Sequence, residues 1–200
     1  MRSRLSRHSV TQQSSALKPE FSLEERRLLL GVAHRSILSA FDGPPPPETS
    51  FSPHLSEPRG VFTTLYLRGN LRGCVGYALP VAPLHSAVAD SARAAAFEDT
   101  RFCPVTQAEA LELQVSLSVL SRLAPVQPEE VEVGRHGLVI SLGSRRGLLL
   151  PQVPVEHHWD RETFLEHTCH KAGLDPQAWR HGATLEAFTA EVFGDEEAAK

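Results

Sequence analysis

The sequence has few cysteines and no long apolar run, and both absences limit what kind of protein it encodes. Its three cysteines, Cys74, Cys103 and Cys169, are odd in number and lie far apart, without the C-x-x-C spacing of zinc or redox sites. This usage predicts a reduced protein of the cytoplasm. No stretch approaches the roughly 18 apolar residues that a membrane span requires, and no apolar signal-peptide core follows the basic amino terminus. We therefore expect no membrane partner.

Common catalytic and nucleotide-binding motifs are also missing. The sequence contains no G-x-S-x-G nucleophile elbow, and the pair Gly73 and Gly76 lacks the further glycines of a P-loop or a dinucleotide fingerprint. The formal net charge is -4, and the first twenty residues are basic, which leaves about -7 for the remainder. An acidic body binds nucleic acid poorly. We expect no serine hydrolase, no nucleotide or other cofactor and no nucleic-acid partner.

Length and composition are those of one folded unit with short tails. The chain has 200 residues, of which 41% are apolar and 22% charged, and these values are typical of a globular domain. We predict a disordered N-terminal tail over 1–20, one domain over 21–194 and an acidic C-terminal tail over 195–200. The tail over 1–20 is rich in Arg and Ser, so a targeting segment is the alternative interpretation.

Helix signals occur at four places. The segments 22–25 and 106–109 have the capping-box pattern, which predicts a helix beginning near Leu23 and a short helix after 106. Pro83 is typical of a first helical turn, and the alanine-rich stretch after it predicts a helix that ends near Phe97. Asp160 is a favourable N-cap for a helix through Ala172, with Gly173 as its terminator.

Strand signals alternate with these helices. Apolar and polar residues alternate over 60–67, 71–77 and 111–119, and two further apolar runs flank a basic turn at 143–146. A last strand is expected over 185–193. Because the strands come mostly in hairpins with helices inserted between them, the pattern predicts an α+β fold with an antiparallel β-sheet flanked by helices.

The segment Leu71-Arg72-Gly73-Cys74-Val75-Gly76 is the candidate site. In a regular strand, Leu71, Val75 and Tyr77 face the core, whereas Arg72, Cys74 and Gly76 face the other way. A dry core rarely accepts an unpaired Arg, so we expect Cys74 to border a cleft, with Arg72 favouring the thiolate. In the alternative interpretation the glycines serve a bend and Cys74 is a small filler residue.

Other candidate groups have weaker patterns. His136 lies in a predicted turn and is either a base for Cys74 or a plain turn residue. Arg101 either lines the same cleft or pairs with Glu98 or Asp99 at a helix end. The cluster His157, His158, His167, Cys169 and His170 lacks the closed spacing of a metal site, so we predict no metal.

Several motifs follow one another in order along the chain: Leu71-Arg72-Gly73-Cys74-Val75-Gly76, the stretch 95–102, Ser118-Val119-Leu120-Ser121, His136-Gly137-Leu138, the stretch 145–153 and Lys171-Ala172-Gly173-Leu174. On these motifs, the sequence from about Phe21 to Phe193 resembles the AMMECR-type domain family, whose prokaryotic members are called AmmeMemoRadiSam system protein A. Val75 stands where the family signature has isoleucine. The resemblance implies a larger and a smaller subdomain sharing one core, and association with a Memo-like protein and a radical SAM enzyme.

Two functional hypotheses follow. In the first, the protein is an enzyme in which Cys74 is a nucleophile or redox centre, Arg72 favours the thiolate or binds an anionic group, and His136 transfers protons. The residues expected to bind its ligand are Gly73, Gly76 and Arg101. In the alternative, the protein is a non-catalytic module that docks a small ligand or a protein through the LRGCVG surface.

Overall fold

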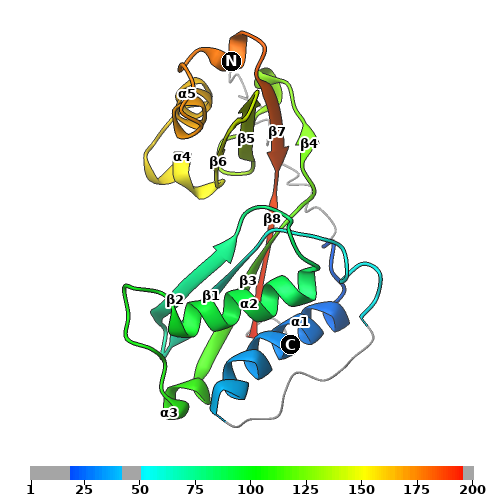
Figure 1. Cartoon of the computed structure of the whole chain (residues 1–200), viewed down its shortest axis with the longest axis vertical. Coiled ribbons are helices and arrows are strands. Elements are labelled where there is room, and N and C mark those ends of the chain that lie inside the picture. Colours follow the sequence, from blue (N-terminus) through cyan, green and yellow to red (C-terminus); the bar gives the residue numbers. More distant parts are fainter. Residues whose placement is uncertain (1–18, 42–50, 196–200) are drawn as a thin grey trace, which may run out of the picture.

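The computed structural model describes residues 19–41 and 51–195. Within these ranges the chain forms two antiparallel sheets of four strands each, in the orders β2-β1-β3-β8 and β4-β7-β5-β6. Figure 1 shows the first sheet with α1 and α2, which we call the large subdomain, and the second sheet with α4 and α5, which we call the small subdomain. The predicted α+β fold with antiparallel sheets is confirmed. The two predicted tails lie almost entirely outside the described residues.

The elements have the following bounds. The large subdomain contains α1 (Leu23–Leu38), η1 (Ser39–Phe41), β1 (Val61–Leu67), β2 (Asn70–Tyr77), α2 (Leu84–Phe97), α3 (Gln107–Ala110), β3 (Leu113–Leu120) and β8 (Ala190–Gly194). The small subdomain contains β4 (Ala124–Pro125), η2 (Pro128–Glu130), β5 (Gly137–Leu142), β6 (Arg145–Leu149), α4 (Gln152–Glu156), α5 (Arg161–Lys171), η3 (Ala178–Arg180) and β7 (Thr184–Phe188). None of the helices in these described ranges has the length and apolarity needed to cross a membrane.

The predicted helix starts are confirmed by their caps. Ser22 Oγ accepts from the Glu25 amide, and the Glu25 carboxylate accepts from the Ser22 amide at 2.9 Å. The same reciprocal pair begins α3. At α5, Asp160 Oδ1 accepts from the Thr163 amide at 2.8 Å. Because these side chains satisfy amides that have no partner inside the helix, the local sequence is enough to fix where each helix begins.

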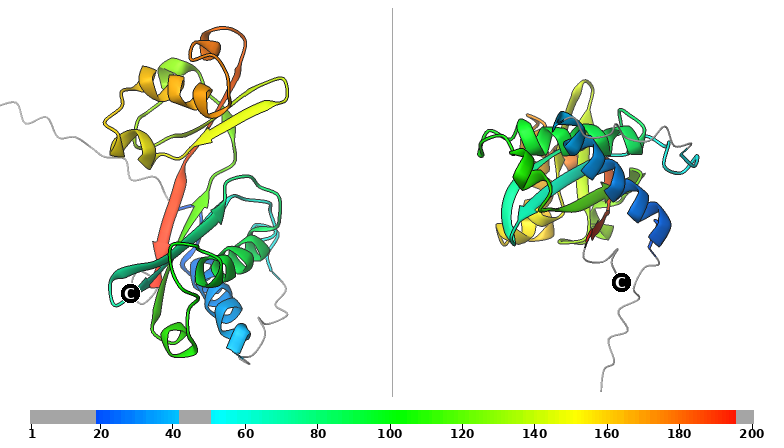
Figure 2. Two further views of the ribbon diagram at one scale, coloured as in Figure 1. Left: turned by 60° about the vertical axis from the view of Figure 1, so that its left-hand side comes forward. Right: turned by 90° about the horizontal axis from the view of Figure 1, so that it is seen from below.

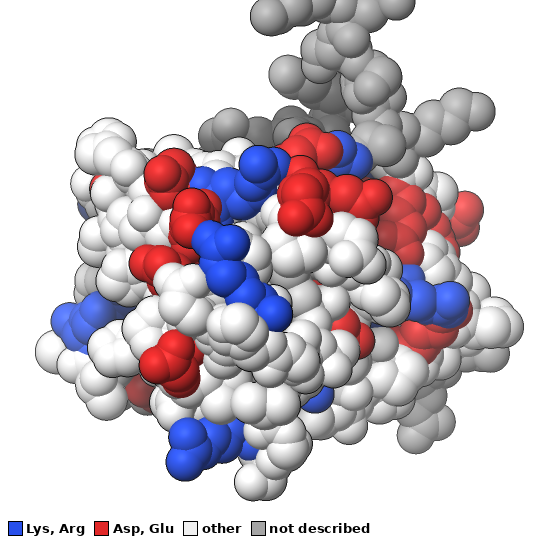
Figure 3. All heavy atoms as spheres, turned by 90° about the horizontal axis from the view of Figure 1, so that it is seen from above, with Lys and Arg blue, Asp and Glu red and all other residues white. Residues whose placement is uncertain are grey.

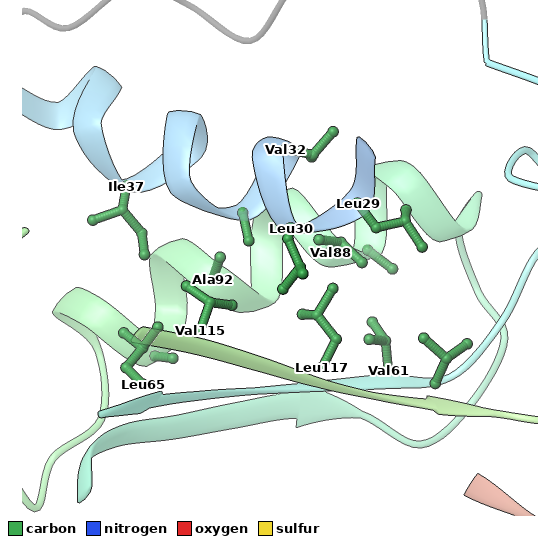
Figure 4. Close-up of a cluster of buried hydrophobic side chains, with 14 of the residues drawn as sticks. Leu29, Leu30, Val32, Ile37, Val61, Leu65, Val88, Ala92, Val115 and Leu117 are labelled. Atoms are coloured by element: carbon green, nitrogen blue, oxygen red, sulfur yellow. The ribbon is translucent and has the colours of Figure 1, made fainter. Parts of the chain in front are cut away.

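The core of the large subdomain lies between the sheet and the pair α1 and α2. Alternation along β1 and β3 turns one residue in two toward the helices. The odd-numbered residues over 61–65 and 113–119 are buried there, and Leu67 is partly buried. Figure 4 shows these side chains below the two helices, where they meet apolar residues of α1 and α2. The labelled set is Leu29, Leu30, Val32, Ile37, Val61, Leu65, Val88, Ala92, Val115 and Leu117.

The small subdomain has its own core, which refines the expectation of one shared core. Phe164 and Leu165 of α5 pack on Leu138 and Ile140 of β5. A third cluster, centred on Leu120, Val139 and Phe188, includes side chains from both subdomains and joins them. On the end of the small subdomain that Figure 3 shows, basic and acidic side chains are interspersed.

The predicted last strand over 185–193 is interrupted at Thr189. Its first part is β7 of the small subdomain, and its second part is β8 of the large one. At the break, the Ser121 amide donates to the Thr189 carbonyl at 2.8 Å, and the Thr189 amide donates to Ser121 Oγ at 3.0 Å. The chain therefore passes between the subdomains at 121–123 and again at Thr189, where its backbone pairs with Ser121.

The loop before β1 is held to the start of α1 by a charged network. His54 lies 2.8 Å from Glu25 and 3.5 Å from Glu20, and its ring stacks on Phe21. Burial by itself lowers the pKa of His54, but hydrogen bonds and charge from the two carboxylates outweigh it and raise that pKa. Arg59, which is almost fully buried, also pairs with Glu20.

Candidate functional site

A cleft of about 990 Å³ lies between the two subdomains. Its floor is the face of the large sheet that points away from α1 and α2, and Figure 2 shows this sheet and the small subdomain from two other directions. Residues from β1, β2, β3 and β8 line it on one side, and the turn at 134–135 with the segment 150–156 lines it on the other. Because the cleft belongs to neither subdomain alone, it depends on how they are joined.

Cys74 lies on the floor of this cleft. It is half-buried, pairs with Thr64 of β1 across the strands, and shares its face with Phe62 and Gly76. Thr64 Oγ1 donates to Cys74 Sγ at 3.3 Å. A hydroxyl donor at this position stabilises negative charge on sulfur, since a hydrogen bond to the charged form favours that form.

Asp99 and Arg101 connect the loop after α2 to Cys74. Asp99 Oδ2 accepts from the Cys74 amide at 2.8 Å and from Arg101 Nη2 at 2.7 Å, while Oδ1 accepts from Arg101 Nε at 2.9 Å. Arg101 Nη2 also lies 3.4 Å from the Cys74 carbonyl, which it donates to. Since β2 is an edge strand, the carboxylate supplies the acceptor that a neighbouring strand would otherwise provide.

The charge states of this pair follow from the same contacts. Hydrogen bonds from Arg101 and the Cys74 amide hold the pKa of Asp99 well below its usual range, against the effect of burial. The hydrogen bond to Asp99 raises the pKa of Arg101, burial opposes this, and the charges of Asp99 and of a Cys74 thiolate add to it. Asp99 and Arg101 are therefore both ionised at neutral pH, and the cation is close enough to interact with a Cys74 thiolate.

Arg72 does not contact the thiol. Its guanidinium binds Glu109, with Nε donating to Oε1 at 3.1 Å, and Nη1 donates to the Cys103 carbonyl at 2.9 Å. The hydrogen bond from Arg72, together with hydrogen bonds from Thr106, lowers the pKa of Glu109 to about 2, against the effect of burial. Arg72 turns away from the thiol because β2 has a bulge at this point. Leu65 pairs with Gly73, but the next residue of β1 pairs with Leu71, so the pairing skips Arg72.

The bulge also makes part of the expected face pattern wrong. At the bulge, Leu71 pairs with Tyr66 on the face away from the helices and is 42% exposed. Tyr77 keeps its register with Val61, but it lies at the end of an edge strand and is 39% exposed. Only Val75 of the expected core set packs against the large core. One extra residue in a strand turns every following side chain to the other face, so alternation read from sequence fails at a bulge.

The two signature glycines occupy crowded positions. A Cβ at Gly73 would lie 2.1 Å from the Ala95 carbonyl oxygen of α2, and one at Gly76 would lie 2.4 Å from the Val61 carbonyl oxygen. Gly73 is buried under the helix, whereas Gly76 also lines the cleft. The close neighbour of each glycine is thus another part of the backbone of this chain.

His136 lies next to the cleft and shapes one of its turns. Its Nδ1 accepts from the Glu132 amide at 3.1 Å, and its neighbours Gly134 and Arg135 line the cleft with Cys74, although His136 does not. Burial, together with the charge of Arg135, lowers the pKa of His136, while Glu132 opposes the shift. A neutral ring agrees with this geometry, since only an unprotonated Nδ1 can accept the amide.

The histidine-rich segment of the small subdomain is used for stacking. The Trp159 ring lies between His157 and His167, with ring centroids 4.8 and 3.9 Å away. Cys169 is fully buried, and burial raises the pKa of its thiol. In the part of the chain that the structure describes, no three His, Cys, Asp or Glu side chains come close enough together to hold a metal ion.

Sequence reasoning missed Thr64, Asp99 and Arg135 as parts of the site. Asp99 was visible in the motif Asp99-Thr100-Arg101, but nothing in the sequence showed that its carboxylate reaches the amide of Cys74. Thr64 follows from hairpin pairing once the register is known. Arg135 had no local signal, because its place in the cleft depends on packing between subdomains.

These features define a two-subdomain α+β protein with a cysteine in the cleft between the subdomains. The chain belongs to the AMMECR1 family, whose profile matches residues 30–193. It is 44% identical over 184 residues to Protein Mbar_A1807 of Methanosarcina barkeri, a match that covers 86% of this chain and 91% of that one. A protein of Aquifex aeolicus is 40% identical over 182 residues, covering 86% and 93%.

A solved structure has the same fold. It is the crystal structure of the uncharacterized protein PH0010 from Pyrococcus horikoshii, which is 42% identical in sequence. The superposition has a TM-score of 0.62 and covers 84% of this chain and 90% of that one. The α+β architecture is therefore shared with a relative whose structure was determined by experiment.

Proposed function

We propose that this protein is an enzyme that uses Cys74 as a nucleophile or redox centre on a ligand held in the cleft between the subdomains. One observation carries the proposal: Cys74 lines the cleft, its sulfur accepts a hydrogen bond from Thr64, and the Arg101 guanidinium, which also lines the cleft, binds the Cys74 backbone carbonyl. Reactive cysteines lie in partly exposed, electropositive surroundings, whereas structural cysteines are buried and inert. Cys74 is partly exposed and has a guanidinium next to its backbone, so it is closer to the first kind than the fully buried Cys169 is.

In this proposal Arg101 takes the role that the sequence assigned to Arg72. The carboxylate of Asp99 fixes the Arg101 guanidinium by two N–H groups, so the cation stays at the Cys74 backbone. Thr64 donates to the sulfur as negative charge develops on it. The described residues that line the cleft include no histidine, so the thiol proton is expected to pass to water or to the ligand.

The alternative is a non-catalytic binding module, and the apolar character of the cleft favours it. Phe62, Val75, Leu120, Val155 and Val192 all line the cavity, and a mainly apolar pocket with few polar groups is typical of ligand binding in general. Both hypotheses use the same cleft. They differ in whether the thiol of Cys74 is activated.

Alkylation rates separate the two hypotheses. At neutral pH, Cys74 is expected to react with iodoacetamide severalfold faster than the exposed Cys103, because Thr64 donates to its sulfur and Arg101 holds a positive charge next to Cys74. Cys169 is expected to stay unlabelled, since it is fully buried. Timed alkylation followed by peptide mass spectrometry measures the three rates.

A pair of arginine variants controls this experiment. Arg101→Gln is expected to slow labelling of Cys74, whereas Arg68→Gln is not, because Arg68 is 76% exposed at the hairpin tip and pairs with Glu112. Labelling of Cys74 no faster than that of Cys103, in the unaltered protein, would contradict an activated thiol and favour the binding module.

The proposal also includes partners and location. Resemblance to the AmmeMemoRadiSam system supports a role beside a Memo-like protein and a radical SAM enzyme, and the three free cysteines support a cytoplasmic protein. A tagged copy of this chain, co-expressed with the Memo-like and radical SAM proteins of its own genome, is expected to retain at least one of them on purification. Recovery of neither partner, with all three proteins soluble, would count against the association.

A further inference from the structure

We propose that the ligand of the cleft is an organic anion with an apolar body, whose charged group is bound between Arg101 and Arg135. This inference rests on the proposed function, because it names the class of ligand that the same site takes. Its basis is the position of the two guanidinium groups, which come from different subdomains and line one cavity. The anionic group is a carboxylate or a phosphate, since a guanidinium fork binds both.

Arg101 retains donors for a ligand. Its Nε and Nη2 bind Asp99, and Nη2 also reaches the Cys74 carbonyl. Among the described contacts, Nη1 has no hydrogen-bond partner, and the side chain is 56% exposed while Asp99 is only 6% exposed. The carboxylate therefore lies behind the guanidinium, and the free edge of the guanidinium is the part accessible to a ligand.

Arg135 lines the cleft from the small subdomain in a more exposed ion pair, in which Arg135 is 47% and Glu132 57% exposed. Its Nη1 donates to Glu132 Oε1 at 2.7 Å, and no described contact involves its Nε or Nη2. The turn that carries it is closed by His136, whose Nδ1 accepts the Glu132 amide. Glu132 does not line the cleft, whereas Arg135 does. Each arginine thus pairs with a carboxylate that does not line the cavity.

The other residues that line the cleft determine the second property of the ligand, its apolar body. Among the described residues around the cavity, Glu156 is the one carboxylate, so two guanidinium groups face a single acidic group. The remaining walls are mainly aliphatic or aromatic, and apolar surface of this kind favours an apolar body over a sugar or a polyanion. The residues that form these walls are Phe62, Val75, Leu120, Leu150, Pro151, Val155 and Val192.

Calorimetry with four probes tests the inference on the full chain. 4-Phenylbutyrate and phenyl phosphate carry an apolar body and an anion, 4-phenylbutyramide is the neutral counterpart of the first, and acetate is an anion without an apolar body. At least one aromatic anion is expected to bind about tenfold more tightly than the amide and than acetate, because charge-assisted hydrogen bonds and apolar burial both contribute. The stronger of the two identifies the group as carboxylate or phosphate.

Variants locate the binding. Arg101→Gln and Arg135→Gln are each expected to weaken binding of the aromatic anion by about tenfold. Arg68 lies in an exposed ion pair outside the cleft, so Arg68→Gln is expected to leave this affinity unchanged. The inference is overturned by equal binding of the amide, by binding that neither cleft variant weakens, or by the absence of binding to every probe. Circular dichroism of each variant confirms that it is folded.

The same titration in Cys74→Ser keeps this inference distinct from the proposed enzyme. Serine retains the small side chain and leaves both arginines in place, so the aromatic anion is expected to bind within about twofold of the unaltered protein. Binding without an activated thiol in the alkylation experiment would leave the ligand class standing and remove the enzyme. An activated thiol without binding of any probe would leave the proposed enzyme standing and overturn the ligand class.

Discussion

Gly73→Ala is expected to destabilise the protein by about 3 kcal/mol or more, the upper part of the range for overpacking a closed site. The added Cβ would lie 2.1 Å from the Ala95 carbonyl oxygen and 3.0 Å from its carbon. Both are backbone atoms of α2, which packs on β1 and β2 and cannot move away without opening the large core. Urea denaturation, followed by far-UV circular dichroism, measures the change in the free energy of unfolding.

Gly69→Ala in the same hairpin is the matched control. Gly69 has a φ of 79°, and an added Cβ would have nothing within 4 Å. Gly69→Ala is therefore expected to lower the free energy of unfolding by only about 1–2 kcal/mol, from backbone strain. If Gly73→Ala is no more destabilising than Gly69→Ala, the helix does not close on the strand at Gly73 as described. In that case the glycine is free to admit a ligand, as the sequence interpretation allowed.

Asp99→Ala is expected to destabilise by roughly 2–3 kcal/mol and to slow alkylation of Cys74. The variant removes the acceptor of the Cys74 amide, and it releases the Arg101 guanidinium from its position at the Cys74 carbonyl. Asp99→Asn is the matched variant, because its amide oxygen still accepts the Cys74 N–H while the negative charge is gone. It is expected to recover part of the stability but not the rate.

The pH dependence of stability provides a second test of Asp99. Its pKa in the folded protein lies well below the ordinary value of 3.8, so its contribution is fully present above the unfolded value and is lost as pH falls toward the folded pKa. The difference in unfolding free energy between the unaltered protein and Asp99→Asn is therefore expected to shrink as pH falls below about 4. A difference that stays constant down to pH 2 would show that the carboxylate is not held in its ionised form.

Most elements of the fold followed from local patterns. The capping boxes at Ser22 and Thr106 gave helix starts that the structure confirms, because a cap involves residues three positions apart and needs no distant partner. The alternation along β3 was equally local, although the strand begins at Leu113 and the exposed Leu111 caps α3. The interruption at Thr189 was not predictable, since its cause is a pairing with Ser121, 68 residues away.

The candidate site was found in part for the same reason. A glycine-flanked cysteine beside an arginine is a local pattern, and it pointed to the strand that carries Cys74 on the floor of the cleft. The cation assigned to the thiol was not the one the structure places there: a bulge moves Arg72 onto Glu109, and the loop after α2 brings Arg101 to Cys74. Single-residue shifts in register leave no mark in composition or alternation.

The sequence by itself determined the α+β class, the helix starts, the hairpins and the segment that carries Cys74. All of these depend on side chains within a few positions of one another, so their physical causes are already present in a short peptide. Only the tertiary structure decided that Arg101 and Arg135 share one cleft, that Asp99 holds the Cys74 amide, and that Gly73 lies under α2. Those contacts join residues distant in sequence, and they exist only once sheet register and packing between the subdomains are fixed.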